Sequence, residues 1–139
     1  MIRRSLVTTL GTCLVTIIVS IGIMGIANAQ DKAGLTIAQS AVCQDVVDRQ
    51  PVGIGDVFPK EISKLYCFTK VVGASSETTI THNWYYNGDL KASVVLPVRS
   101  PSWRTWSSKT IDPSMTGEWM VEILAADGTA LDSVIFYLK

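Results

Sequence analysis

The chain has 139 residues, enough for one domain, and its 12 basic and 12 acidic residues give it no net charge. It contains neither a basic patch nor a run of acidic residues. Binding to nucleic acid, or to an anionic membrane surface by charge alone, is therefore not expected.

The first 29 residues have the three parts of a secretory signal peptide. Arg3 and Arg4 precede an uncharged apolar run over residues 6–26, and an Ala-x-Ala cleavage pattern then ends at Ala29. We expect cleavage near Ala29, which leaves a periplasmic or secreted product. An uncleaved anchor facing outward is the alternative, because about 20 apolar residues can cross a bilayer.

A short flexible tail, residues 30–34, should lead into one domain that covers residues 35–139. This part holds two cysteines, Cys43 and Cys67. An even number of cysteines in an exported protein favours a disulfide, which would stabilise the fold by roughly 3 kcal/mol. Two buried free thiols are the alternative, since cysteine is often buried in cores.

Short strands separated by turn signals fill the domain, and almost nothing in it is helical. Residues 48–56 are expected to form a loop, because they contain one proline and two glycines. Asn87-Gly88 and Asp127-Gly128 each predict a β-hairpin. The seven expected strands cover residues 35–42, 63–72, 78–86, 89–98, 103–111, 117–125 and 129–138. This pattern predicts an all-β fold, an antiparallel β-sandwich of about seven strands and of immunoglobulin or fibronectin type; a small closed barrel is the alternative.

The third expected strand contains the only histidine of the chain. Ile80, His82 and Trp84 share one face of this strand, because side chains alternate between the two faces. That face is the apolar one, so we expect His82 to point into the core. There it would hydrogen-bond a carboxylate, a hydroxyl or a backbone carbonyl.

Catalysis is not expected, although a small enzyme centred on His82 stays as a remote alternative. The sequence has no nucleophile elbow, no glycine-rich phosphate loop and no calcium loop. One histidine and two cysteines without Cys-x-x-Cys spacing are a poor set of zinc ligands. We therefore predict no metal and no cofactor.

The fifth expected strand contains two tryptophans, Trp103 and Trp106, three positions apart. They must lie on opposite faces of a regular strand, so only one of them can enter the core. If Trp103 is buried, Trp106 shares the outer face with Arg104 and Ser108, next to Lys109. Such a surface suits a sugar ring or a protein partner. The alternative is that Arg104 merely covers the indole in a cation–π contact.

Several stretches, taken together, carry a resemblance to a known family. They are the segment from Cys43 through Val46-Val47-Asp48-Arg49-Gln50-Pro51-Val52-Gly53, Leu65-Tyr66-Cys67-Phe68-Thr69, His82-Asn83-Trp84-Tyr85-Tyr86-Asn87-Gly88, Arg104-Thr105-Trp106-Ser107-Ser108-Lys109 and Gly117-Glu118-Trp119-Met120-Val121. Over residues 35–138 the chain resembles a bacterial family known as domain of unknown function 2914. The resemblance implies a sandwich-like module outside the cytoplasm, and it brings no established activity and no site residues.

These observations favour a non-catalytic binding module of the bacterial envelope that binds a protein partner. The alternative is a module that binds carbohydrate or peptidoglycan through one tryptophan of residues 103–109. The candidate binding residues are Trp103, Arg104, Trp106, Ser108, Lys109 and His82. A membrane would be involved only through the N-terminal segment, if that segment is not cleaved.

Overall fold

The structure is a computed structural model, and it describes residues 34–139. The predicted signal segment, with its cleavage site, and residues 30–33 of the predicted tail lie outside the described residues. Within the described range the chain forms ten strands and no helix. The strands are β1 (Thr36–Cys43), β2 (Asp45–Val47), β3 (Gln50–Val52), β4 (Val57–Phe58), β5 (Lys64–Val72), β6 (Thr78–Tyr86), β7 (Asp89–Val98), β8 (Ser102–Thr110), β9 (Gly117–Ala125) and β10 (Ala130–Leu138).

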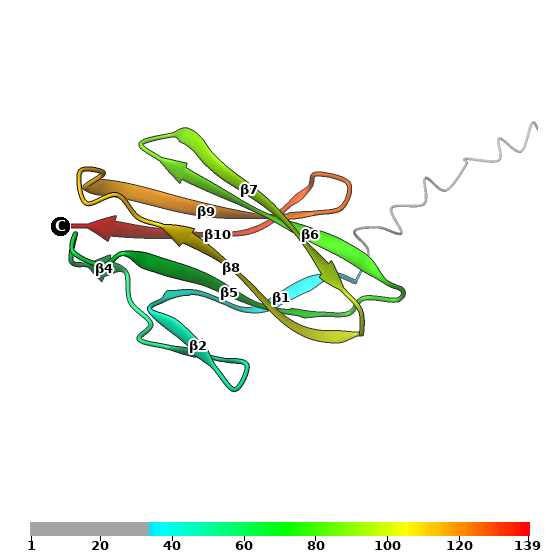
Figure 1. Ribbon diagram of the computed structural model, residues 1–139. Coiled ribbons are helices and arrows are strands. Elements are labelled where there is room, and N and C mark those ends of the chain that lie inside the picture. The colour runs from blue at the N-terminus through cyan, green and yellow to red at the C-terminus, as the bar shows by residue number, and fades with distance from the viewer. Residues whose placement is uncertain (1–33) are drawn as a thin grey trace, which may run out of the picture.

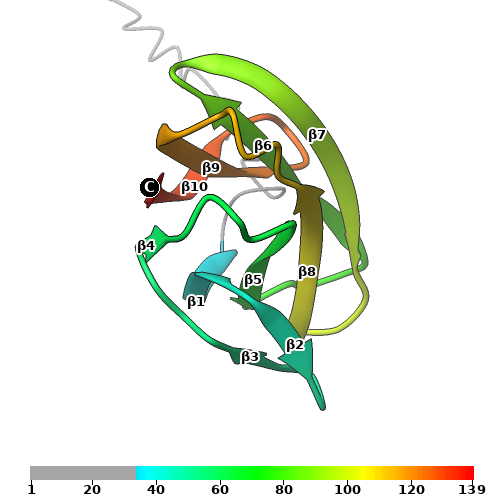
Figure 2. The same cartoon turned by 60° about the vertical axis from the view of Figure 1, so that its left-hand side comes forward.

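Two sheets form the body of the domain (Figure 1). The small sheet has three strands in the order β1-β5-β8, and the large sheet has five in the order β4-β10-β9-β6-β7. All pairs are antiparallel except β4 with β10. A separate hairpin of β2 and β3 lies beside the small sheet (Figure 2). β7 and β8 are the edge strands on one side of the domain, each in a different sheet.

The core lies between the two sheets, as the alternation of apolar residues predicts. Ile80, His82 and Trp84 of β6 are all fully buried. Trp84 packs in one cluster with Leu65 and Cys67 of the small sheet. The cluster continues through Trp119, Val121, Phe136 and Leu138 of β9 and β10. The predicted all-β sandwich is therefore confirmed.

The two predicted hairpins form where the turn signals lie. Asn87 and Gly88 both have positive φ, 47° and 84°, between β6 and β7. In the second hairpin Gly128 has a φ of 85° and donates its N–H to Ala125 C=O at 2.9 Å. Glycine tolerates such angles best, which explains its place at both turns.

The prediction of a plain loop over residues 48–56 is wrong in its first part. Val47 and Gln50 pair across a two-residue turn, and the hairpin of β2 and β3 results. The turn residues Asp48 and Arg49 have φ values of 51° and 59°. Sequence inspection missed this turn because arginine, unlike glycine, seldom adopts positive φ. Two-residue β4, which follows at the edge of the large sheet, was missed as well.

The predicted disulfide between Cys43 and Cys67 is absent; both cysteines are free thiols and both are buried. Cys67 lies opposite Val42, and Cys43 lies opposite Tyr66, on the paired strands β1 and β5. Because side chains alternate, the two sulfurs lie on opposite faces of the small sheet. Cys67 faces the core, and Cys43 lies under the β2–β3 hairpin, where its thiol meets the backbone of Val52. The two strands are adjacent, as a disulfide requires, but their register is shifted by one residue from the one that would place the two cysteines opposite each other.

Candidate functional site

Strand β8 divides its side chains between the core and the surface. Trp103 packs against the apolar cluster around Val71 and Ile123. Thr105 and Ser107 are buried on the same inner face. The outer face therefore carries Arg104, Trp106 and Ser108, as the parity of the strand predicts. Both tryptophans are only partly buried.

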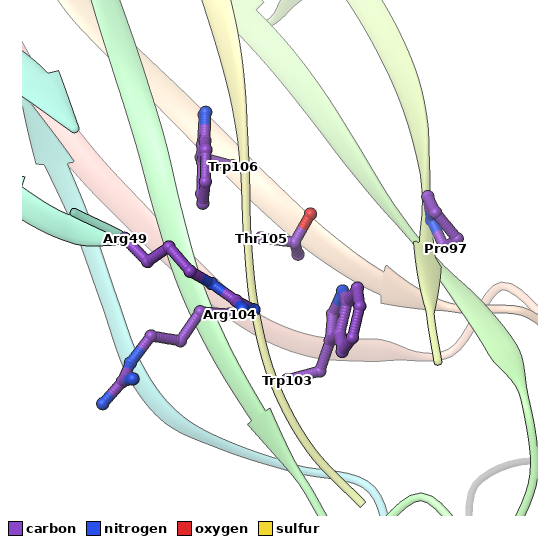
Figure 3. Close-up of a pocket in the computed structure, with 6 residues that line it drawn as sticks. All are labelled: Arg49, Pro97, Trp103, Arg104, Thr105 and Trp106. Atoms are coloured by element: carbon purple, nitrogen blue, oxygen red, sulfur yellow. The ribbon is translucent and has the colours of Figure 1, made fainter. Parts of the chain in front are cut away.

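A pocket of about 380 Å³ lies at this strand, and we call it the Arg–Trp pocket. It is lined by Arg49, Pro97, Trp103, Arg104, Thr105 and Trp106. Figure 3 shows Trp103 between β8 and Pro97, which belongs to β7. The pocket therefore lies on the side of the domain where the edges of the two sheets meet.

Arg49 reaches this pocket from the tip of the β2–β3 hairpin (Figure 3). Its guanidinium lies 5.5 Å from the centre of the Trp103 ring, which is a cation–π distance. Figure 3 also shows the guanidinium of Arg104 turned away from Trp103. The predicted contact of Arg104 over an indole is thus replaced by Arg49 over Trp103. Among the described residues, two cations line the pocket and no carboxylate does.

His82 lies elsewhere, in the centre of the sandwich. Its side chain is fully buried, so it offers no surface to a ligand, and its place among the candidate binding residues is not supported. Its Nε2 lies 2.9 Å from Thr69 Oγ1, and its Nδ1 lies 2.7 Å from Ser107 Oγ. Trp84 Nε1 donates to the same Ser107 oxygen at 3.0 Å. Burial lowers the pKa of His82 to about 4, so the ring is neutral at neutral pH.

The structure thus divides the six predicted binding residues into three groups. Trp103, Arg104 and Trp106 line the pocket. Ser108 and Lys109 follow on the same strand, outside the pocket, and Lys109 Nζ donates to Thr110 C=O at 3.0 Å. His82 is in the core.

Three pocket residues were missed: Arg49, Pro97 and Thr105. Thr105 lies within the strand predicted over residues 103–111, and Pro97 lies within the strand predicted over residues 89–98, but only the packing of β7 beside β8 brings them together. Arg49 depends on a turn that carries no glycine signal. Charge is the one sequence signal for a cationic site here, because β8 contains Arg104 and no acidic residue follows it before Asp112.

Within residues 34–139, no group of three or more His, Cys, Asp or Glu side chains is placed to hold a metal ion. Among the same residues there is no helix with the length and apolar character needed to cross a membrane.

Residues 77–138 match the model of a family described as protein of unknown function (DUF2914). The match confirms the predicted resemblance over this range, which contains β6 to β10 and therefore the tryptophans of the pocket. The resemblance over residues 35–76, where Arg49 lies, stays a prediction. No curated protein sequence matches the chain.

Similarity to solved structures is distant. A Niemann-Pick type C2 protein from Japanese carpenter ant is 11% identical with a TM-score of 0.45, over 76% of this chain and 93% of that chain. A β-glucosidase from Kluyveromyces marxianus is 10% identical with a TM-score of 0.40, over 76% of this chain and 14% of that chain. Scores of this size carry no conclusion about ligand or activity.

Proposed function

We propose that this chain is a non-catalytic binding module outside the cytoplasm, and that it binds a protein partner through the Arg–Trp pocket. The observation that carries the proposal is the meeting of two arginines and two tryptophans at one pocket, which no carboxylate of residues 34–139 lines. Tryptophan and arginine are the residues that contribute most to protein interfaces. The proposed location rests on the signal-like segment of residues 1–29.

The chemistry of the pocket selects a partner that presents carboxylates. Arg49 and Arg104 come from different elements, so the pocket holds two positive charges in a chain whose overall charge is balanced. A guanidinium binds a carboxylate in a planar geometry with two parallel hydrogen bonds. The partly buried indole of Trp106 lies beside these charges and can pack against an apolar side chain of the partner.

An acidic carbohydrate is the second candidate, and one observation favours it. Trp106 lies on the outer face of β8, is partly exposed and has no cation–π contact with the described residues, whereas Arg49 lies over Trp103. A free aromatic face can stack on a sugar ring. Cell-wall glycan with peptide carboxylates would offer both groups at once.

The test is a pull-down with the full-length chain, which is incubated with solubilised envelope proteins and, separately, with isolated cell-wall sacculi. Arg49→Gly removes one cation without straining the turn, because Arg49 already has a φ of 59°. Trp106→Ala removes the indole on the outer face of β8. Lys109→Ala is the matched control, since it removes a positive charge from the same strand but from outside the pocket.

We expect one specific protein to be retained by the wild type and by Lys109→Ala. Retention should fall by roughly 10-fold or more in Arg49→Gly and in Trp106→Ala, because a central interface residue contributes on this scale. Retention on sacculi that Trp106→Ala abolishes would favour the carbohydrate instead. Binding that none of the pocket variants weakens would reject the pocket as the site.

A further inference from the structure

The position of the Arg–Trp pocket relative to β8 points to the form that a bound partner takes. The pocket is lined by four consecutive residues, from Trp103 to Trp106. Successive side chains of a strand point to opposite faces, so a pocket on one face would contact only every second residue. Contact with all four places the pocket against the edge of the strand. That edge is where a further strand of the small sheet would lie, since β8 is the last strand in the order β1-β5-β8.

The hydrogen bonds at the two ends of β8 show which backbone groups face this open edge. Ile111 donates its N–H to Ser63 C=O at 2.9 Å, and Gly73 donates to Pro101 C=O at 2.8 Å. Both pairs continue the regular register of β5 with β8, in which Lys64 lies opposite Thr110. Hydrogen-bonded pairs recur at every second residue of an antiparallel ladder. The odd-numbered residues of β8 therefore bond to β5, and the even-numbered residues direct their N–H and C=O groups outward.

Side chains already occupy this open edge at both ends of the strand. Ser100 Oγ donates to Ser102 C=O at 2.7 Å, and Lys109 Nζ donates to Thr110 C=O at 3.0 Å. Between them lie Arg104, Trp106 and Ser108, whose outward backbone groups have no partner in the part of the chain that the structure describes. Unpaired strand edges of this kind are templates for pairing with another chain.

We propose that β8 accepts an extended acidic segment of the partner protein as a fourth strand of the small sheet, paired with Arg104, Trp106 and Ser108. This inference rests on the proposed function and specifies its partner. The segment's side chains opposite Arg104 would share the outer face with it, so a carboxylate there meets a guanidinium. The alternate side chains of the segment would point toward the inner face of β8, where Thr105 lies.

Charge argues for an acidic segment and against a second copy of this chain. From Leu90 to Ile111 the sequence has four cations, Lys91, Arg99, Arg104 and Lys109, and no acidic residue. Antiparallel pairing of β8 with β8 of another copy would bring cations near cations, which is unfavourable. An acidic strand instead places a carboxylate beside Arg104.

The experiment uses the full-length chain and a short synthetic peptide of alternating Glu and Val, with binding followed by tryptophan fluorescence. Two N-methylated versions of the peptide are compared. One version carries N-methyl groups on its odd-numbered residues, and the other carries them on its even-numbered residues. Only one set of peptide N–H groups can bond to β8, so one version should lose affinity by roughly 10-fold or more and the other should keep most of it. Side-chain binding without strand pairing would not distinguish the two versions.

A protein variant tests the same edge from the other side. Ser108→Pro removes an outward N–H and no bond to β5, and proline is tolerated at such edge positions. It should weaken peptide binding by roughly 10-fold relative to Ser108→Ala, which keeps the N–H. Amide hydrogen exchange should show Arg104, Trp106 and Ser108 exchanging fast in the free protein and slowly with peptide bound.

The outcomes separate this inference from the proposed function. Equal binding of both N-methylated versions, or unchanged exchange at the three amides, would overturn the added strand. If the peptide then still binds and Arg49→Gly weakens it, the pocket remains the binding site. Failure of the unmethylated peptide to bind would also overturn the added strand, and the pull-down would decide the proposed function independently.

Discussion

Ser107 is the residue that joins the buried polar groups of the core. Its hydroxyl accepts the Trp84 indole N–H at 3.0 Å and lies 2.7 Å from His82 Nδ1. The serine proton is then free to point at Nδ1, which leaves the ring proton on Nε2 to donate to Thr69 Oγ1 at 2.9 Å. Thr69 in turn hydrogen-bonds the Cys67 thiol. This order gives each donor an acceptor, as buried polar groups require.

Removing the Ser107 hydroxyl should therefore be costly. In Ser107→Ala both Trp84 Nε1 and His82 Nδ1 lose their partner in a buried place. We expect the free energy of unfolding to fall by about 2–3 kcal/mol, measured by urea denaturation, because each unsatisfied buried group carries its desolvation penalty. Ser108→Ala, next to it but exposed, should change stability by less than about 0.5 kcal/mol. Equal effects of the two variants would contradict the network.

The sequence predicted that His82 points into the core, but it did not predict which residues His82 would hydrogen-bond. Strand parity placed His82 beside Ile80 and Trp84 in the core, and a hydroxyl was among the expected partners. That the hydroxyls belong to Thr69 and Ser107 depends on how the small sheet packs over β6. Packing between sheets leaves no local pattern in the sequence, so these partners required the structure.

At the scale of strands, register decides what the cysteines do. The spacing of Cys43 and Cys67 allowed a disulfide, and β1 and β5 are indeed adjacent. A shift of one residue in pairing moves a side chain to the other face of a sheet. The observed register pairs Cys67 with Val42 instead. The sequences of two separate strands do not predict the register in which they pair.

Both thiols should consequently be intact and unreactive in the folded protein. Burial raises the pKa of Cys67 to about 12 and also raises the pKa of Cys43, so little of the reactive thiolate form exists at neutral pH. A thiol reagent such as a disulfide dye should modify neither Cys43 nor Cys67 until urea unfolds the chain, and then modify both. A disulfide that joins Cys43 to Cys67, identified by peptide mapping of protein purified under oxidising conditions, would show that the register can shift.

The β2–β3 hairpin shows where element prediction failed and why it matters for the site. The turn uses Asp48 and Arg49 at positive φ in place of glycine, so turn statistics pointed to a loop. Yet this unusual turn brings Arg49 over Trp103. The long strands were predictable from alternation because burial imposes it on them. The pocket was predictable only as far as β8 itself, since its other walls come from β7 and from this hairpin.

At the scale of the whole molecule, the neutral state of His82 links stability to pH. Burial lowers the pKa of His82 to about 4, from an ordinary value of 6.5. Between these two values the unfolded chain binds a proton that the folded chain does not. The contribution of neutral His82 to the free energy of unfolding should thus be fully present above pH 6.5, and it should decrease as the pH falls from 6.5 to 4. The loss between pH 7 and pH 5 should be about 2 kcal/mol, because each pH unit in this window contributes up to about 1.4 kcal/mol.

Urea denaturation at pH 7 and pH 5 measures this loss, and His82→Gln is the variant that should abolish it. The interval avoids Asp112, whose pKa is lowered below its ordinary 3.8 by hydrogen bonds from Ser114 and which therefore titrates in more acidic solution. In NMR spectra of the wild type, the His82 ring signals should stay constant from pH 7.5 to pH 5. Ring signals that move with a midpoint near 6.5 would mean that water and protons reach His82. The core between the two sheets would then open in solution, and a site at His82 would again have to be considered.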